Sequence, residues 1–78
     1  MDDLSETVVI DVRGLKCPLP VLKAERRMQS FASGRRFLIV ATDPMAAVDI
    51  PHFCNEKGHT LLASAQEGRE LRFEIEKG

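Results

Sequence analysis

The chain lacks several features on which common protein functions depend. It has no Trp and no Tyr among its 78 residues, and four Phe are its only large aromatic residues. Proteins that read single-stranded RNA stack bases on aromatic rings, so this composition argues against direct nucleic-acid binding. No apolar run approaches the ~20 residues that span a bilayer, so we expect no contact with a membrane.

Cysteine is scarce as well. Cys17 and Cys54 are the only two, and they form no C-x-x-C pair. The segment Met1–Glu6 is acidic and has no apolar core, so we expect no secretory signal and a cytoplasmic location in which both thiols are free. His52, Cys54 and His59 match no standard zinc spacing, so no metal is expected.

What the chain does contain is typical of one small globular domain. It is 44% hydrophobic and 29% charged, with a net charge of −1, and we expect a single domain over residues 1–78 and a monomer. The basic residues are concentrated between positions 13 and 36. Seven of the eleven lie there, against one acid, Glu25; they are Arg13, Lys16, Lys23, Arg26, Arg27, Arg35 and Arg36. This segment is suited to an acidic partner or nucleic acid, although charge alone favours a solvated helix face.

The first half of the chain reads as a strand, a helix and a strand. The β-branched run Thr7–Val12 predicts a strand, and an apolar stripe predicts an amphipathic helix over Pro18–Ala32. That stripe consists of Val21, Ala24, Met28 and Phe31. The continuous apolar run in Arg36–Thr42 predicts a second strand that is central or parallel.

The second half predicts another helix and a hairpin. Asp43-Pro44 is typical of a helix start, but Pro51 predicts an interruption, with a restart capped by Asp49 and an end near Gly58. Strands are expected over Thr60–Ala65 and Leu71–Glu76, joined by a turn at Glu67-Gly68. The order β-α-β-α-β-β indicates a two-layer α/β sandwich (α+β), with a four-stranded mixed sheet and two helices on one face.

The most informative motif lies where the first strand meets the first helix. It reads Gly14-Leu15-Lys16-Cys17-Pro18-Leu19-Pro20. A helix N-terminus stabilises a nearby anion, and Lys16 and Arg13 add positive charge, so we expect a moderately lowered pKa for the Cys17 thiol. Pro18 and Pro20 stiffen the first turn and direct the sulfur outward. The alternative is a small buried side chain that happens to precede a helix.

This strand, the Cys-Pro-x-Pro element and the basic helix, in this order, resemble the TusA/SirA family of small sulfur-carrier proteins. The resemblance extends to Asp43-Pro44, Asp49-Ile50-Pro51, Phe53-Cys54 and Gly58-His59. It implies the same mixed sheet with two helices on one side. It also implies a sulfurtransferase in which Cys17 accepts sulfane sulfur as a persulfide, without cofactor, and passes it on.

The resemblance implies partners rather than a self-contained enzyme. The donor is a cysteine desulfurase or a rhodanese, and the acceptor belongs to tRNA thiolation, sulfur oxidation, molybdenum-cofactor supply or selenium metabolism. Gly14, Pro18 and Pro20 frame the cysteine, whereas Lys16, Lys23, Arg26 and Arg27 are expected to guide an acidic partner. Cys54 is expected to be structural, with a resolving thiol as the alternative.

Two other functional classes stay open on the residues themselves. One is a regulatory or RNA-binding module that uses the basic helix without transferring sulfur. The other is a redox sensor that pairs Cys17 with Cys54. Replacing Cys17 by Ser abolishes transfer and sensing but spares RNA binding, whereas replacing Cys54 affects only sensing.

Overall fold

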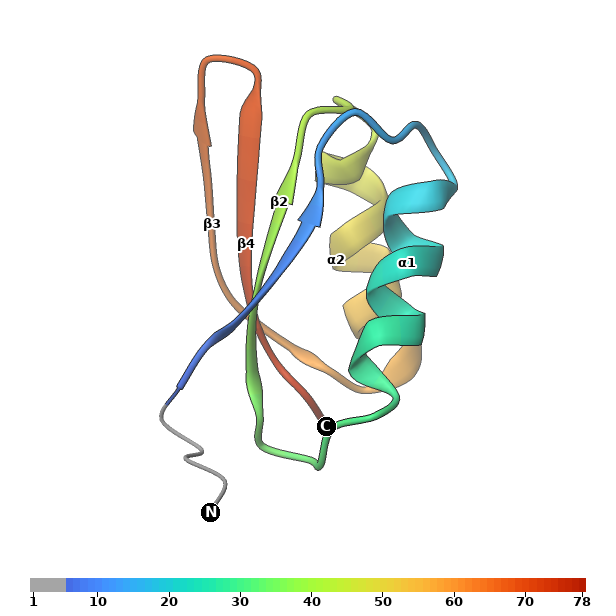
Figure 1. Ribbon diagram of the computed structural model, residues 1–78, viewed down its shortest axis with the longest axis vertical. Coiled ribbons are helices and arrows are strands. Elements are labelled where there is room, and N and C mark those ends of the chain that lie inside the picture. The colour runs from blue at the N-terminus through green and yellow to red at the C-terminus, as the bar shows by residue number, and fades with distance from the viewer. Residues whose placement is uncertain (1–5) are drawn as a thin grey trace.

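The computed structural model describes residues 6–78, which form six elements in the predicted order (Figure 1). The strands are β1 (Val8–Val12), β2 (Arg36–Ala41), β3 (Thr60–Glu67) and β4 (Glu70–Glu76), and the helices are α1 (Leu19–Met28) and α2 (Ala46–Lys57). The expectation that the chain has no secretory signal was based on residues 1–6, and the first five of these lie outside the described residues. Neither described helix is long and apolar enough to cross a bilayer.

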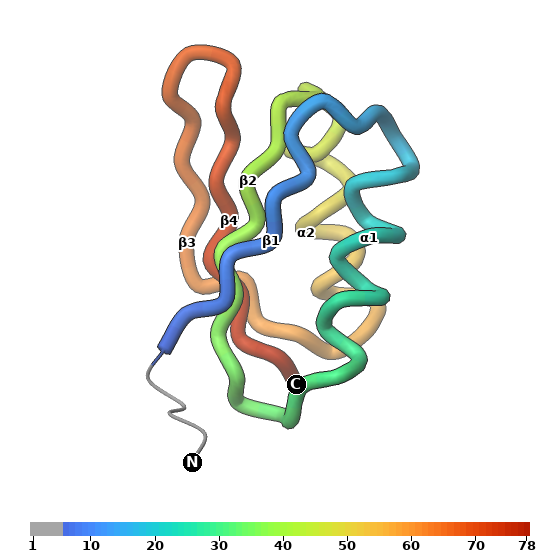
Figure 2. Tube along the Cα trace, in the orientation of Figure 1, coloured from blue at the N-terminus to red at the C-terminus, as the bar shows by residue number. Residues whose placement is uncertain are grey.

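The four strands of the described part form one mixed sheet in the order β1-β2-β4-β3. β1 runs parallel to β2, and Val8 lies opposite Phe37. β4 runs antiparallel to both β2 and β3, which makes β3 and β4 a hairpin. Figure 1 shows both helices on one face of this sheet, and the tube in Figure 2 follows the crossover from β1 through α1 to β2. The predicted two-layer sandwich is confirmed.

The core lies between the sheet and the two helices. Alternate strand residues point into it, because successive side chains of a strand face opposite sides of the sheet. The strands contribute Ile10, Val12, Phe37, Ile39, Ala41, Leu71, Phe73 and Ile75, and the helices contribute Ala24, Met28, Ala46, Ile50, Phe53 and Cys54. Burial of this apolar surface is the main favourable term in folding and holds both helices against the sheet, α1 on β1 and α2 on β3 and β4.

α1 is shorter than the apolar stripe predicts. It ends at Met28, where the Lys77 ammonium donates hydrogen bonds to the carbonyls of Met28 (2.9 Å) and Phe31. A tighter turn follows, with the Phe31 N–H donating to the Met28 carbonyl at 3.1 Å. The Phe31 ring still packs edge-on against Phe37, with 5.3 Å between ring centroids. Periodicity therefore identified the packing residues correctly but not the end of the helix.

The predicted interruption at Pro51 is wrong. α2 runs without a break from Ala46 to Lys57, with Pro51 inside it, and ends at Gly58, whose φ of 75° is left-handed. The hydrogen bond that Pro51 cannot donate would go to the carbonyl of Ala47, an exposed residue in the first turn where water can replace it. Ile50, Phe53 and Cys54 are buried on either side of Pro51, and their packing offsets the cost of the proline.

Two further boundaries differ from expectation. α2 starts at Ala46 rather than Pro44, because Asp43 and Pro44 form a turn in which the Asp43 carboxylate accepts the Met45 N–H at 3.1 Å. The hairpin is also longer than predicted. Glu67 pairs with Glu70, so the connection is Gly68-Arg69 rather than Glu67-Gly68, with Gly68 at a φ of 60°.

Candidate functional site around Cys17

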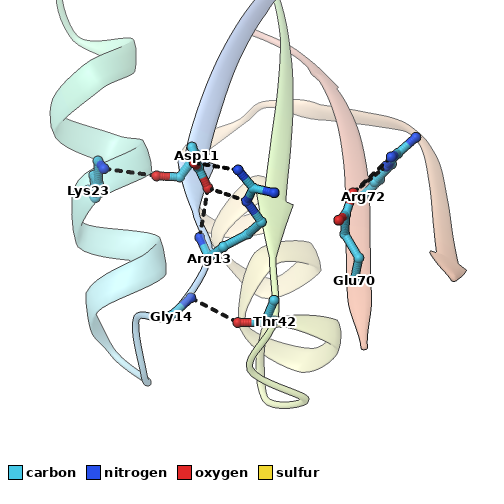
Figure 3. A network of polar contacts seen from close by, with 7 residues as sticks. All are labelled: Asp11, Arg13, Gly14, Lys23, Thr42, Glu70 and Arg72. Carbon is cyan, nitrogen blue, oxygen red and sulfur yellow. Dashed lines mark hydrogen bonds and ion pairs between the residues drawn. The ribbon is translucent and has the colours of Figure 1, made fainter. Parts of the chain in front are cut away.

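The loop between β1 and α1 is tied to the neighbouring strand and its following loop. Gly14 has a φ of 79°, which favours glycine, and its N–H donates to the Thr42 hydroxyl at 2.9 Å (Figure 3). The Leu15 N–H donates back to the carbonyl of Val12 at 3.3 Å. Thr42 directly follows β2, so these contacts join the carboxyl ends of two parallel strands. Gly14 thus ties the loop that carries Cys17 to the residue that follows β2.

Cys17 is held by the same junction. Its backbone N–H donates to Asp43 Oδ2 at 2.7 Å, and Asp43 Oδ1 accepts from Met45 just before α2. The side chain of Cys17 is exposed. The peptide bond between Cys17 and Pro18 is cis, Pro18 directly precedes α1, and Pro20 is buried in the first turn of that helix. The sulfur is therefore presented to solvent on a backbone that α1 and the start of α2 both fix.

The electrostatic environment of Cys17 differs from the expected one. A hydrogen bond to the Asp49 carboxylate, reinforced by partial desolvation and by the negative charges of Asp49 and Asp43, raises the pKa of the Cys17 thiol. Lys16 acts on Asp43, whose pKa is lowered first by the N–H groups of Cys17 and Met45 and then by Lys16. The predicted lowering of the Cys17 pKa is wrong, because two carboxylates at the start of α2 outweigh the N-terminus of α1.

Arg13 does not supply the expected positive charge either. Its guanidinium forms two hydrogen bonds with the Asp11 carboxylate, at 2.9 and 3.0 Å, as Figure 3 shows. This pairing lowers the pKa of Asp11 to about 2. Arg13 is thus engaged on the strand rather than directed at the thiol.

A groove of about 280 Å³ runs from Cys17 between the two helices. From α1 and the residue before it, the groove is lined by Pro18, Val21 and Glu25. From α2 it is lined by Asp49, His52, Phe53, Glu56 and Lys57. An ion pair joins Lys57 to Glu25 at 3.6 Å, and His52 Nε2 lies 2.7 Å from Glu56 Oε2. The lining of the groove is thus partly apolar and partly charged, and Cys17 belongs to it.

Exposed apolar side chains surround the same end of the molecule. Leu19 and Leu22 on α1 are 50% and 53% exposed, and Met45 and Val48 at the start of α2 are 48% and 62% exposed. Both helices begin beside the Cys17 loop, so these side chains lie at the same end of the molecule as the thiol. An exposed apolar patch of this kind is typical of a surface that a partner protein covers.

The four basic residues predicted to bind a partner are all exposed, but only Lys16 is adjacent to Cys17. The Lys23 ammonium donates to the carbonyl of Asp11 at 2.8 Å, which ties α1 to β1 (Figure 3). The guanidinium of Arg27 lies 5.6 Å from the centre of the Phe31 ring. Lys23, Arg26 and Arg27 are thus distributed along α1, and none of the four predicted residues lines the groove.

The remaining cysteine and histidines have structural surroundings. Cys54 is 2% exposed in the core, as expected, and burial raises the pKa of its thiol to about 11. The His59 ring lies 5.2 Å from the Phe53 ring, and its Nδ1 accepts the Gly78 N–H at 3.0 Å. Over residues 6–78, no three metal-ligating side chains converge on one point.

Sequence reasoning missed the two carboxylates of the site. It used Asp43 and Asp49 as helix caps and as part of the family resemblance but did not place them beside Cys17, although Asp43 binds the Cys17 backbone and Asp49 raises the pKa of the thiol. A topological signal was present. The loops at the carboxyl ends of adjacent parallel strands meet at one edge of a sheet, and Asp43 follows the second strand as Cys17 follows the first.

Comparison with known proteins agrees with the Cys-Pro-x-Pro resemblance. The family model described as Sulfurtransferase TusA matches residues 8–77. A sulfur carrier protein TusA of Pseudomonas putida strain GB-1 is 36% identical over 77 residues, which cover 99% of this chain and 96% of that protein. The protein of the same name from strain W619 is also 36% identical over the same coverage.

A solved structure shares the fold. The SirA-like protein from Desulfitobacterium hafniense superposes with a TM-score of 0.79 at 16% sequence identity. The match covers 91% of this chain and 97% of that one. At this identity the likeness shows the fold alone, and it agrees with the arrangement of strands and helices in Figure 1.

Proposed function

Because the chain belongs to the TusA sulfurtransferase family, we propose that it is a sulfur carrier in which Cys17 is the carrying residue. The observation that supports this most directly is the exposed Cys17 thiol on a backbone fixed by Asp43. A carried sulfur must be reached by a cysteine of another protein, so exposure on a rigid loop suits the role better than a deep pocket. Residues 1–78 act as one carrier domain, monomeric and cytoplasmic.

The proposed reaction is an exchange between sulfur atoms. The Cys17 sulfur attacks the outer, sulfane sulfur of a donor persulfide R–S–SH, the donor S–S bond breaks, and the departing sulfur takes up the proton that leaves Cys17. The sum is Cys17–SH + R–S–SH → Cys17–S–SH + R–SH, which needs no external oxidant or reductant. Delivery repeats the step, with the acceptor cysteine attacking the outer sulfur on Cys17.

The surroundings of Cys17 support docking with two partners in turn. A donor such as a cysteine desulfurase or a rhodanese, and then an acceptor, covers the exposed apolar residues beside the thiol. Two of these, Leu19 and Val48, come from different helices. Gly14, Pro18 and Pro20 hold the loop in position. Lys16, Lys23, Arg26 and Arg27 contribute long-range attraction to an acidic partner, which mainly raises the association rate.

Intact mass spectrometry tests the proposal. The protein is incubated with a cysteine desulfurase and cysteine, or with a rhodanese and thiosulfate. We expect a gain of one sulfur, about 32 Da, which a reductant removes. Cys17→Ser abolishes the gain, and Cys54→Ser is the matched control that retains it. A folded protein with a free thiol that gains no sulfur from either donor contradicts the proposal and favours a binding module built on α1.

A further inference from the structure

Asp49 belongs to the Cys17 site by position as well as by charge. It lies in the first turn of α2, where its N–H donates to the Met45 carbonyl at 2.9 Å, and its half-buried side chain lines the groove together with Cys17. The carboxylate acts on the Cys17 thiol as a hydrogen-bond acceptor and as a negative charge, and both effects raise the pKa of that thiol. The backbone of Cys17 is tied to Asp43 at the same helix start. Thiol and carboxylate are therefore both carried on fixed backbone.

We propose that Asp49 is the positioning residue of this site: its carboxylate lines the same groove as Cys17 and orients the thiol while the groove is unoccupied. The proposal rests on the sulfur-carrier function proposed above and deepens it. It assigns to Asp49 control of when Cys17 becomes a nucleophile. The proton that Asp49 holds in place is the one that must leave the sulfur during loading.

The charges around the thiol favour this role. Asp43 has the same sign as Asp49 and acts on the same thiol. Lys16, the neighbouring cation, acts on Asp43. The other charged or titratable side chains of the groove contact one another rather than the thiol: Lys57 pairs with Glu25, and His52 contacts Glu56. Around Cys17 itself, negative charge thus predominates, which disfavours a second negative charge on the sulfur.

A protonated resting state has a chemical advantage for an exposed carrier. The thiolate, not the thiol, reacts with peroxides and disulfides, and an exposed thiolate is the form most readily oxidised. With Asp49 in place, the free protein presents Cys17 in its unreactive form. A partner that covers the groove brings its own charges against Asp49 and changes this balance only while it is bound.

The test is the pH dependence of alkylation by iodoacetamide, a neutral reagent, followed by intact mass. Asp49→Asn keeps the shape of the side chain and removes its charge. We expect Cys17 to react about two- to fivefold faster at pH 7, the range typical for loss of an exposed charge pair. The pH dependence of the alkylation rate of this variant moves to lower pH. Glu56→Gln makes the same charge change in the same groove and leaves the profile unchanged. Asp49→Glu keeps the charge and stays close to wild type.

Equal profiles for wild type and Asp49→Asn overturn the proposal, as does equal acceleration in Asp49→Asn and Asp49→Glu. One rapid adduct per chain shows that Cys54 stays buried and the variant is folded. If the Asp49→Asn variant does not fold, a measurement on the wild-type protein tests the same role. Raising the ionic strength screens the charge of Asp49 and speeds alkylation of Cys17 at pH 7. No dependence on salt contradicts the role.

These measurements separate this inference from the carrier function. Alkylation uses no sulfur donor, so it decides the role of Asp49 whatever the loading experiment shows. Loading is then followed with inorganic polysulfide, from which the Cys17 thiolate takes one sulfur as a shorter polysulfide leaves. We expect Asp49→Asn to gain its sulfur about two- to fivefold faster than wild type at pH 7, in step with alkylation. Faster alkylation without faster loading overturns the proposed link between Asp49 and the carrier reaction.

Discussion

Replacing either cysteine by serine is expected to have opposite effects on stability and on sulfur loading. Cys54 is 2% exposed in the core, whereas Cys17 is exposed in its loop. Cys54→Ser places a hydroxyl in an apolar environment, at a cost of about 1–3 kcal/mol. The new hydroxyl bonds back to the carbonyl of Ile50 one turn earlier in α2, which favours the lower half of that range. Cys17→Ser changes stability by less than about 0.5 kcal/mol.

These energies are large relative to the stability of the chain. At about 0.05–0.15 kcal/mol per residue, 78 residues give a free energy of unfolding of roughly 4–12 kcal/mol. In a domain of this size, 1 kcal/mol changes Tm by about 4–8 °C. We therefore expect Cys54→Ser to lower Tm by roughly 4–16 °C and Cys17→Ser to leave it within a few degrees of wild type.

Thermal unfolding by circular dichroism, with sulfur loading measured at 25 °C on the same samples, checks both halves. Cys54→Ser loads sulfur normally and melts early, and Cys17→Ser melts normally and loads none. A Cys54→Ser protein with unchanged Tm refutes the packing argument. A folded Cys54→Ser protein that no longer loads sulfur assigns Cys54 a resolving role instead.

Three further predictions follow from other contacts. Folding raises the pKa of Cys54 from 9.0 to about 11, so the free energy of unfolding is unaffected below pH 9 and falls above it, by at most about 1.4 kcal/mol per pH unit. Urea unfolding at pH 8 and pH 10 checks this, and Cys54→Ala loses less stability between the two pH values than the wild type does. Lys77→Met removes both ammonium bonds at the end of α1 and lowers the free energy of urea unfolding by about 1–3 kcal/mol, whereas an unchanged value contradicts this capping role. Charge reversal along α1 slows loading from a desulfurase at low salt but not at high salt, and rates equal to wild type at low salt exclude steering. The reversed residues are Lys23, Arg26 and Arg27.

The sequence predicted the architecture because periodicity and turn residues are local signals. The continuous apolar run around Ile39 predicted a central strand, and alternation after Leu71 predicted a strand with one exposed face. Helix ends were less predictable, because distant groups determine them. Lys77 terminates α1 from the far end of the chain, and packing of Ile50 keeps α2 continuous through Pro51.

The site was predictable in position but not in electrostatics. The motif around Cys17 indicated an exposed thiol at a strand-to-helix junction, and it lies there. The expected lowering of the Cys17 pKa was wrong because a helix N-terminus is a local signal, whereas the two carboxylates are distant in the sequence. Asp43 and Asp49 follow Cys17 by 26 and 32 residues. Only the parallel pairing of β1 and β2 brings them to the thiol.

The hydrogen bonds of the Cys17 loop also affect how tightly a partner must bind. Ordering one residue of a flexible backbone costs about 1–2 kcal/mol, and a mobile loop at this position would add that cost to every docking event. Here the N–H groups of Gly14, Leu15 and Cys17 are already bonded in the free protein, so the ordering occurs once, during folding. A shuttle between two proteins needs contacts that form quickly and release quickly. A preordered loop allows productive docking at modest affinity, which leaves the protein free to depart.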